Sequence, residues 1–272
     1  MLVDIIQTII LGIIQGITEW LPISSTGHMI LFNEFLKLNV SDEFMTMFLV
    51  VIQFGSILAV VTLFFKNLFP WGFNKTKEET KETFSLWFKI LVACIPAGII
   101  GVLFDDLIDE IFFNPWVVAI ALIFYGVLFI IIETVQKGKK PKVDDVKAIT
   151  YKIAFLIGMF QVLALVPGTS RSGATIIGGL ILGLDRTTAA SYTFYLAVPI
   201  MFGASFLRML GFGFSFTNNE LIILLVGTIT AYIVSIIAIR FLLKFVKKND
   251  FKVFGYYRIA LGLLVIAYFL FS

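Results

Sequence analysis

Cysteine and histidine are almost absent from this chain of 272 residues, which contains one of each, Cys94 and His28. A single cysteine excludes an intramolecular disulfide and a metal site built from several cysteines. Charge is also scarce, because Asp, Glu, Lys and Arg together make up only 14% of the residues. A typical soluble domain carries about 25% charged residues, so this is not the composition of a soluble protein. The first residues include no basic segment, and we therefore expect no cleaved signal peptide.

Apolar residues are abundant instead, at 59% of the chain, and the mean hydropathy is +0.99. Six long apolar runs have the length of transmembrane helices. They cover residues 44–65, 84–104, 111–132, 187–207, 221–239 and 254–271. We therefore predict an all-α polytopic membrane protein that forms a single integral membrane domain over residues 1–272. Its surroundings are the bilayer, and no nucleic-acid partner is expected.

Polar residues interrupt the N-terminal apolar stretch in residues 15–28, QGITEWLPISSTGH. Pro22 cannot continue a helix, and Ser24 or Ser25 is a good N-cap for a new one. The break would expose backbone N–H groups at a helix start, which favours anion binding. Because each half is too short or too polar to span a bilayer, we predict a re-entrant helix-loop-helix within residues 3–37.

The helix before this break carries a polar stripe. Four of its residues follow helical spacing and share one face, namely Gly12, Gln15, Gly16 and Glu19. The two glycines form a small-xxx-small pair, which lets another helix approach closely.

A second break of the same design lies in residues 161–175, QVLALVPGTSRSGAT. Its Gln161 follows Gln15 by 146 positions, and Pro167 supplies the break. Three more apolar runs follow each break, which predicts an internal repeat of residues 1–135 and 150–272. Because three spans are an odd number and a re-entrant hairpin returns to its own side, the second copy must be inverted.

The charges orient this inverted repeat. Lysines and arginines gather in residues 66–89, 137–152 and 240–252, which the positive-inside rule places in the cytoplasm. Acidic residues dominate residues 42–43 and 105–110, which are expected as outer loops. Both termini are then outside, and the first hairpin enters from the outer face. The second hairpin enters from the cytoplasm, so that the two tips meet near the midplane.

Residues 15–28 and 167–175 resemble the two signature motifs of the BacA/UppP family of undecaprenyl-diphosphate phosphatases. The resemblance extends along the whole chain in length, order of spans and placement of loops. It implies a bacterial inner-membrane enzyme that hydrolyses undecaprenyl diphosphate to undecaprenyl phosphate and inorganic phosphate. This reaction recycles the lipid carrier for peptidoglycan and confers bacitracin resistance when the enzyme is abundant. The resemblance also implies a divalent cation, Mg²⁺ or Ca²⁺, and a polyprenyl diphosphate lipid as substrate.

The family's first motif has Glu or Gln, then three residues, then Glu. This chain has the Gln form at Gln15, which leaves Glu19 as the sole carboxylate of the predicted site. Glu19 would be a metal ligand or a general base, with a structural hydrogen-bonded carboxylate as the alternative. Arg171 is also expected to act in catalysis, because its planar fork of donors suits phosphate. A cytoplasmic arginine that snorkels to the membrane surface is the alternative.

The sequence offers two candidates for the nucleophile. Following the family's proposed serine, Ser25 is one candidate, and water held by Glu19 and His28 is the other. His28 lies three residues after Ser25, so it can face the same side and either activate a nucleophile or protonate the leaving group. A cation would serve either route.

The remaining polar and small residues of the two motifs are expected to bind the substrate. They are Gln15, Ser24, Thr26, Gly27, Thr169, Ser170, Ser172, Gly173 and Thr175. Ser24 and Thr26 also have a purely structural explanation as helix caps. A polyprenyl-phosphate transporter or flippase is the alternative function, because inverted repeats with broken helices are a transporter architecture. The sequence leaves a homodimer open.

Overall fold

The computed structural model describes residues 2–25, 27–29, 32, 36, 38–72, 75–112, 114–213 and 215–271. Within these residues the regular elements are helices, and the one β interaction is an isolated bridge between Val143 and Leu184. The helices are α1 (Leu2–Thr18), α3 (Asp42–Leu63), α4 (Phe65–Leu68), α5 (Lys77–Phe112), α6 (Pro115–Gln136), η1 (Val146–Ala148), α7 (Tyr151–Val162), η2 (Leu163–Leu165), α8 (Arg171–Ile181), α9 (Arg186–Phe212), α10 (Asn218–Val246) and α11 (Lys252–Phe271).

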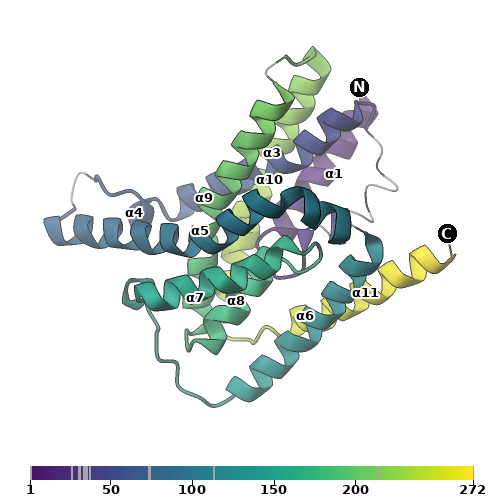
Figure 1. Cartoon of the computed structure of the whole chain (residues 1–272). Coiled ribbons are helices and arrows are strands. Elements are labelled where there is room, and N and C mark those ends of the chain that lie inside the picture. Colours follow the sequence, from purple (N-terminus) through teal and green to yellow (C-terminus); the bar gives the residue numbers. More distant parts are fainter. Residues whose placement is uncertain are drawn as a thin grey trace.

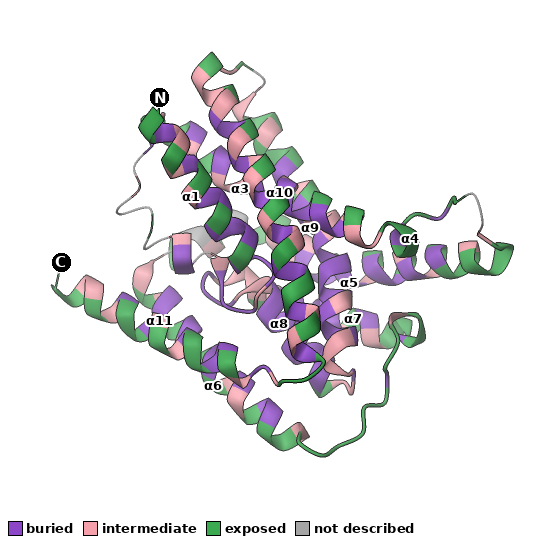
Figure 2. Cartoon of the chain, turned by 180° about the vertical axis from the view of Figure 1, so that it is seen from behind, coloured by how far each residue is buried: buried purple, intermediate pink, exposed green. Residues whose placement is uncertain are grey.

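Six helices in the described part of the chain are long and apolar enough to cross a membrane. They are α3, α5 as far as Phe104, α6, α9, α10 and α11. Each of the six predicted apolar runs overlaps one of them, which confirms a multi-pass, all-helical membrane protein. Figure 2 shows exposed residues along the outer faces of α5, α6 and α11, and many of these are large and apolar. Such faces suit contact with lipid.

The third predicted span is displaced in the structure. The helix α5 continues past Phe104, where a non-helical φ of −127° marks a kink, and ends at Phe112. Asn114 then caps α6, its side chain accepting from the Val117 N–H. The prediction of a span over residues 111–132 is therefore wrong at its start, and the acidic residues 105–110 are helical rather than a loop. Pro115, which suits the first turn of a helix, sets the true start.

The helices pair along their lengths, with α1 on α10, α10 on α3, α3 on α9, α5 on α7, and α6 on α11 (Figure 1). The short helix α8 lies in the middle of the molecule, and residues 172–180 of it are all buried. Because α8 begins in the second predicted motif, the fold places that motif at the centre.

Glycines allow the closest of these approaches. A Cβ added at Gly12 would lie 2.8 Å from Thr230 Cβ, and one at Gly16 would lie 2.8 Å from Val234 Cβ, both on α10. This confirms that the predicted pair of glycines lets another helix approach. Gly158 on α7 has the same place against α5, where a Cβ would lie 2.3 Å from the Ala93 carbonyl oxygen.

Candidate active site

Each polar motif contains a helix break with the same local geometry. The helix α1 ends at Thr18, and helical structure resumes at Ser25 after a turn. Ser24, just before it, has φ 70°, and Ser170, just before α8, has φ 69°. They are the only non-glycine residues with positive φ in the described chain. A side chain in this conformation costs about 1–3 kcal/mol, and such strain gathers at functional sites.

Both serines also cap the helix that follows. Ser24 Oγ accepts from the Gly27 N–H at 3.3 Å, and Ser170 Oγ accepts from the Gly173 N–H at 3.1 Å. The capping role considered for Ser24 is therefore real, and Ser170 has it too. Thr26, the other residue for which a cap was considered, lies outside the described residues.

An ion pair joins the two motifs across 152 positions of sequence. Arg171 Nη2 donates to Glu19 Oε1 at 2.9 Å. The two side chains are only 12% and 8% exposed. The second arm of the guanidinium donates to the Thr193 carbonyl oxygen at 3.0 Å, and its carbon lies 5.8 Å from the centroid of the Trp20 ring. A nearly buried pair of this kind leaves an uncompensated charge if either partner is removed.

Glu19 is the centre of a wider hydrogen-bond network. Its Oε2 accepts from Gln15 Nε2 at 3.0 Å and from Ser25 Oγ at 3.4 Å. Both oxygens of the carboxylate are thus engaged, one by Arg171 and the other by residues of the first motif. The Ser25 hydroxyl is therefore hydrogen-bonded to a carboxylate that can take its proton.

The hydroxyls of the second motif form their own network. Ser170 and Ser172 Oγ lie 3.1 Å apart, and Ser172 Oγ reaches the Leu21 carbonyl oxygen of the first motif at 3.4 Å. Thr175 Oγ1 lies 2.8 Å from Thr193 Oγ1. The structure therefore brings Gln15, Glu19 and Ser25 together with the start of α8. It places Thr175 against α9 instead.

His28 is held away from this network by other partners. Its Nδ1 lies 2.8 Å from the Ser24 carbonyl oxygen, and its Nε2 lies 2.7 Å from the Tyr257 hydroxyl. Within the described residues, Ser25 is hydrogen-bonded to Glu19 and not to His28. Glu19 is accordingly better placed than His28 to act on the Ser25 hydroxyl.

Three residues that contact the two motifs were not predicted from the sequence. They are Thr193, Tyr257 and Arg258. Thr193 and Tyr257 are polar residues inside long apolar helices, where no local pattern distinguishes them. Arg258 left a stronger signal, because an ionisable residue within a transmembrane segment is costly and is usually functional. Its carbonyl partners include Pro22 and Gly168, one in each motif.

The described residues contain no group of three or more His, Cys, Asp or Glu side chains that could hold a metal ion. In the first motif, Glu19 Oε2 lies 3.4 Å from Ser25 Oγ, and the Gln15 side chain is also bonded to it. Mg²⁺ is commonly held by one or two carboxylates together with substrate phosphates and water. The donor set therefore fits a hard cation that arrives with a diphosphate, and does not form a complete protein cage.

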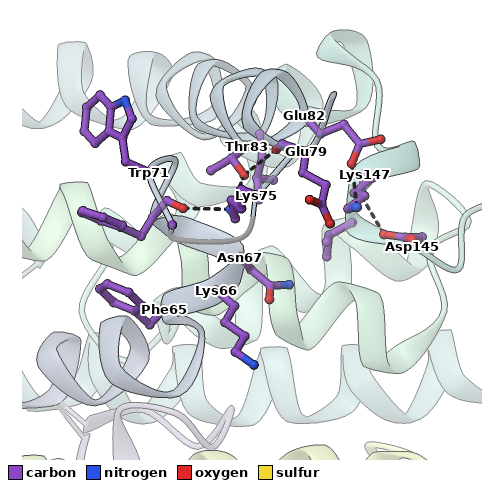
Figure 3. A pocket seen from close by; sticks show the side chains of 14 residues that line it. Phe65, Lys66, Asn67, Trp71, Lys75, Glu79, Glu82, Thr83, Asp145 and Lys147 are labelled. Atoms are coloured by element: carbon purple, nitrogen blue, oxygen red, sulfur yellow. Dashed lines mark hydrogen bonds and ion pairs between the residues drawn. The ribbon is translucent and has the colours of Figure 1, made fainter. Parts of the chain in front are cut away.

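A cavity of about 660 Å³ lies among α4, the start of α5 and η1 (Figure 3). None of its lining residues belongs to the two motifs. Its wall carries three lysines and three carboxylates: Lys66, Lys75, Lys147, Glu79, Glu82 and Asp145. Lys147 pairs with Glu82 at 2.6 Å, and Lys75 donates to the Phe69 carbonyl oxygen at 2.8 Å. This balanced charge does not suit an anionic diphosphate.

Comparison with known proteins identifies the family of this chain. Residues 8–264 match the family described as "Bacitracin resistance protein BacA". The chain belongs to this family. The match covers both helix breaks and most of the chain, and it confirms the resemblance carried by the two motifs.

Individual BacA relatives are similar over nearly their whole length. The undecaprenyl-diphosphatase of Desulfitobacterium hafniense is 59% identical over 269 residues, which cover 98% of this chain and 97% of the relative. Undecaprenyl-diphosphatase 1 of Clostridioides difficile is 57% identical over 268 residues, covering 98% and 97%. The undecaprenyl-diphosphatase of Enterococcus faecalis is 56% identical over 269 residues, covering 98% of each.

Proposed function

We propose that this protein hydrolyses undecaprenyl diphosphate to undecaprenyl phosphate and inorganic phosphate. The observation that carries this proposal is the ion pair of Glu19 with Arg171, which unites the two motifs in one site. The names of the BacA relatives support the same activity. The product is the lipid carrier of cell-wall synthesis, which accounts for the family's description as bacitracin resistance proteins.

The site offers phosphate-binding groups on one side and a carboxylate on the other. Arg171 begins α8, where free backbone N–H groups and the Ser170 and Ser172 hydroxyls are close together. Helix starts and arginine forks both favour phosphate. A diphosphate would draw the guanidinium from Glu19 toward its own oxygens and leave that carboxylate free to accept a proton. Positioning and charge stabilisation of this kind supply most of the catalysis in phosphoryl transfer.

Two routes to the products fit this geometry. In one, Ser25 Oγ attacks the terminal phosphorus, the bond to the bridging oxygen breaks, and water then releases phosphate from the serine. In the other, water attacks the terminal phosphorus directly and the same bond breaks. Glu19 Oε2, 3.4 Å from Ser25 Oγ, is placed to take the proton of the nucleophile in either route. His28 supports the first tip through Ser24 and Tyr257.

A divalent cation, Mg²⁺ or Ca²⁺, would be held by Glu19 as its single carboxylate ligand together with oxygens of the substrate. When bound, the cation would neutralise part of the diphosphate charge. The residues of this chain would then orient the terminal phosphate against Ser25 through Arg171 and the start of α8.

We also propose that the chain is an inverted repeat of two units, each a re-entrant hairpin followed by three spans. The helix pairing supports it, because α1 packs on α10 as α7 packs on α5. The pairs α3 with α9 and α6 with α11 join equivalent helices of the two units. Gly12 and Gly158, 146 positions apart, make the equivalent close contacts. In this arrangement the protein lies in the bacterial inner (cytoplasmic) membrane with both termini outside and the site open toward the outer face.

The activity is tested by phosphate release from purified protein in detergent. Undecaprenyl diphosphate and a shorter prenyl diphosphate serve as substrates, with and without EDTA. We expect phosphate from both lipids, and a loss of activity in EDTA that Mg²⁺ or Ca²⁺ restores. If neither lipid released phosphate, the proposed hydrolysis would be contradicted. Full activity in EDTA would contradict only the proposed role of the cation.

The paired helices also suit a transporter or flippase, because inverted repeats with broken helices are a transporter architecture. A sealed vesicle assay separates the two functions. A transporter would move polyprenyl phosphate across the vesicle membrane without releasing inorganic phosphate from the diphosphate. The hydrolase would release inorganic phosphate from the diphosphate without moving polyprenyl phosphate across the vesicle membrane.

A further inference from the structure

Arg258 of α11 is fully buried and makes an unusual set of contacts. All three nitrogens of its guanidinium donate to backbone carbonyl oxygens. The acceptors are Gly168 at 2.8 Å, Thr169 at 2.9 Å, Pro22 at 3.3 Å, Leu122 at 3.4 Å and Ala121 at 3.5 Å. Among the described residues, no carboxylate forms an ion pair with Arg258. Backbone carbonyl dipoles therefore take the place of a carboxylate partner for this buried charge.

Two of these acceptors occupy the same place in the two motifs. Pro22 lies two residues before Ser24, and Gly168 lies two residues before Ser170. The two serines are the residues with positive φ that cap the helices after the breaks. One guanidinium thus contacts the backbone of both strained turns.

The surrounding packing is fitted to this guanidinium. A Cβ added at Gly173 would lie 3.1 Å from Arg258 Nη1, so the glycine leaves the space that the arginine fills. The Tyr125 ring lies 5.8 Å from the guanidinium carbon. The helix α11 is itself held close to α6, because a Cβ at Gly255 would lie 2.7 Å from the Gly126 carbonyl oxygen.

We propose that Arg258 is a positioning residue that sets the two helix breaks against each other so that Glu19 meets Arg171. It does not contact the substrate, because its nitrogens are all engaged and its side chain has no exposed surface. This inference rests on the active site proposed above. A displacement of about 1 Å in such a site can reduce the rate about a hundredfold.

The test compares Arg258→Lys and Arg258→Gln with Arg186→Lys, which alters another arginine, outside both motifs, that is paired with a buried carboxylate. Arg186 is paired with Glu133 at 2.6 Å. Purified proteins are compared for thermal unfolding, kcat and KM with a short prenyl diphosphate. We expect Arg258→Lys to remain folded, with kcat at least tenfold lower and KM within threefold. Arg186→Lys should keep kcat within threefold.

A spectroscopic measurement reports the position of the first break directly. Trp20 is fully buried beside Arg171, so its fluorescence is recorded in a protein with Trp71, Trp87 and Trp116 changed to Phe. Arg258→Lys should shift this emission, and Arg186→Lys should not. An unshifted emission with kcat within threefold of the wild type would overturn the proposal. A tenfold rise in KM at unchanged kcat would also overturn it, because that pattern indicates substrate contact.

A second pair of variants covers the case in which Arg258→Lys fails to fold. Gly173→Ala leaves Arg258 in place and presses a methyl group toward it, at 3.1 Å from Nη1. Gly179→Ala on the same helix meets Ala189 Cβ at the same 3.1 Å and serves as the control. We expect kcat to fall several-fold more in Gly173→Ala, and equal losses would overturn the proposal. Glu19→Gln is assayed alongside. If Glu19→Gln is inactive and Arg258→Lys has normal activity, the positioning role is refuted while the proposed active site still stands.

Discussion

His28 and Tyr257 are joined by a hydrogen bond of 2.7 Å, and their rings are nearly parallel, at 7°. The Ser24 carbonyl oxygen beside His28 Nδ1 can only accept, so Nδ1 carries a proton. In neutral imidazole the other nitrogen, Nε2, is then the acceptor, and the Tyr257 hydroxyl donates to it. The tautomer and orientation of His28 are therefore set by two residues that lie 233 positions apart in their numbering, Ser24 and Tyr257.

Tyr257→Phe removes the donor to His28 Nε2 and should lower kcat by about three- to tenfold. The expected size follows from one hydrogen bond, which contributes about 0.5–1.5 kcal/mol. Steady-state kinetics measure the loss. Tyr256→Phe is the control, because Tyr256 is the exposed neighbour on the same helix. A Tyr257→Phe enzyme as fast as this control would show that His28 needs no such support.

Glu19→Gln should abolish phosphate release while the protein still inserts and unfolds at a similar temperature. The amide keeps the shape of the side chain but can neither accept a proton from Ser25 nor pair with Arg171. Glu220→Gln is the matched control, since Glu220 belongs to a capping box at the start of α10. Activity of Glu19→Gln within about threefold of the control would remove Glu19 from the mechanism.

Arg171→Lys should reduce kcat/KM by roughly a hundredfold or more, because an ammonium keeps the charge but loses the planar fork. Arg240→Lys in α10 is the control. Ser25→Ala combined with Arg171→Ala should cost much less than the sum of the single losses, as happens when residues act as one unit. Strictly additive losses would mean that the two motifs do not share one site.

The orientation in the membrane is tested with single cysteines in a Cys94→Ser protein. Cysteines replacing Asp42 or Leu107 should react with a membrane-impermeant thiol reagent in intact cells. Cysteines replacing Lys77, Lys140 or Lys248 should react only after lysis. The opposite pattern would reverse the proposed topology and place the first break toward the cytoplasm.

Gly158→Ala should destabilise the protein by about 1–3 kcal/mol, the usual range for overpacking. The new Cβ would lie 2.3 Å from the Ala93 carbonyl oxygen, so α5 and α7 must separate. Gly98→Ala on α5 is the control, because a Cβ there meets nothing within 4 Å. Thermal unfolding in detergent distinguishes the two variants, and equal melting temperatures would refute the close contact.

The sequence was sufficient for the features that depend on composition and local chemistry. Length and hydropathy predicted six spans, and Pro22 and Pro167 with their hydroxyls predicted two helix breaks. The inverted repeat predicted that the tips of the two hairpins meet, which placed Glu19 and Arg171 in one site. These features are local or repeated, so each can be read from a few neighbouring residues.

The remaining features depend on contacts between distant segments. Nothing near Arg258 in the sequence indicates that it would meet the carbonyl oxygens before Ser24 and Ser170. The kink at Phe104 stands at the end of a predicted apolar run, and the helix continues past it through the acidic residues 105–110. Acidic residues suggested an outer loop there, so the start of the next span was predicted too early. His28 was expected to face Ser25 because of their helical spacing. Its partner is instead Tyr257, which no pattern within the first motif could indicate.

The place of Arg258 in the last helix has a consequence for biosynthesis. The two breaks are made long before α11 leaves the ribosome, and until then the carbonyl oxygens around Pro22 and Gly168 lack their common donor. Unpaired carbonyls are costly in an apolar setting, and long-range contacts form late and slowly. A nascent or truncated chain can therefore contain both motifs in full and still have no assembled catalytic centre. On the proposed role of Arg258, the enzyme would become active only when the final helix has docked on α6.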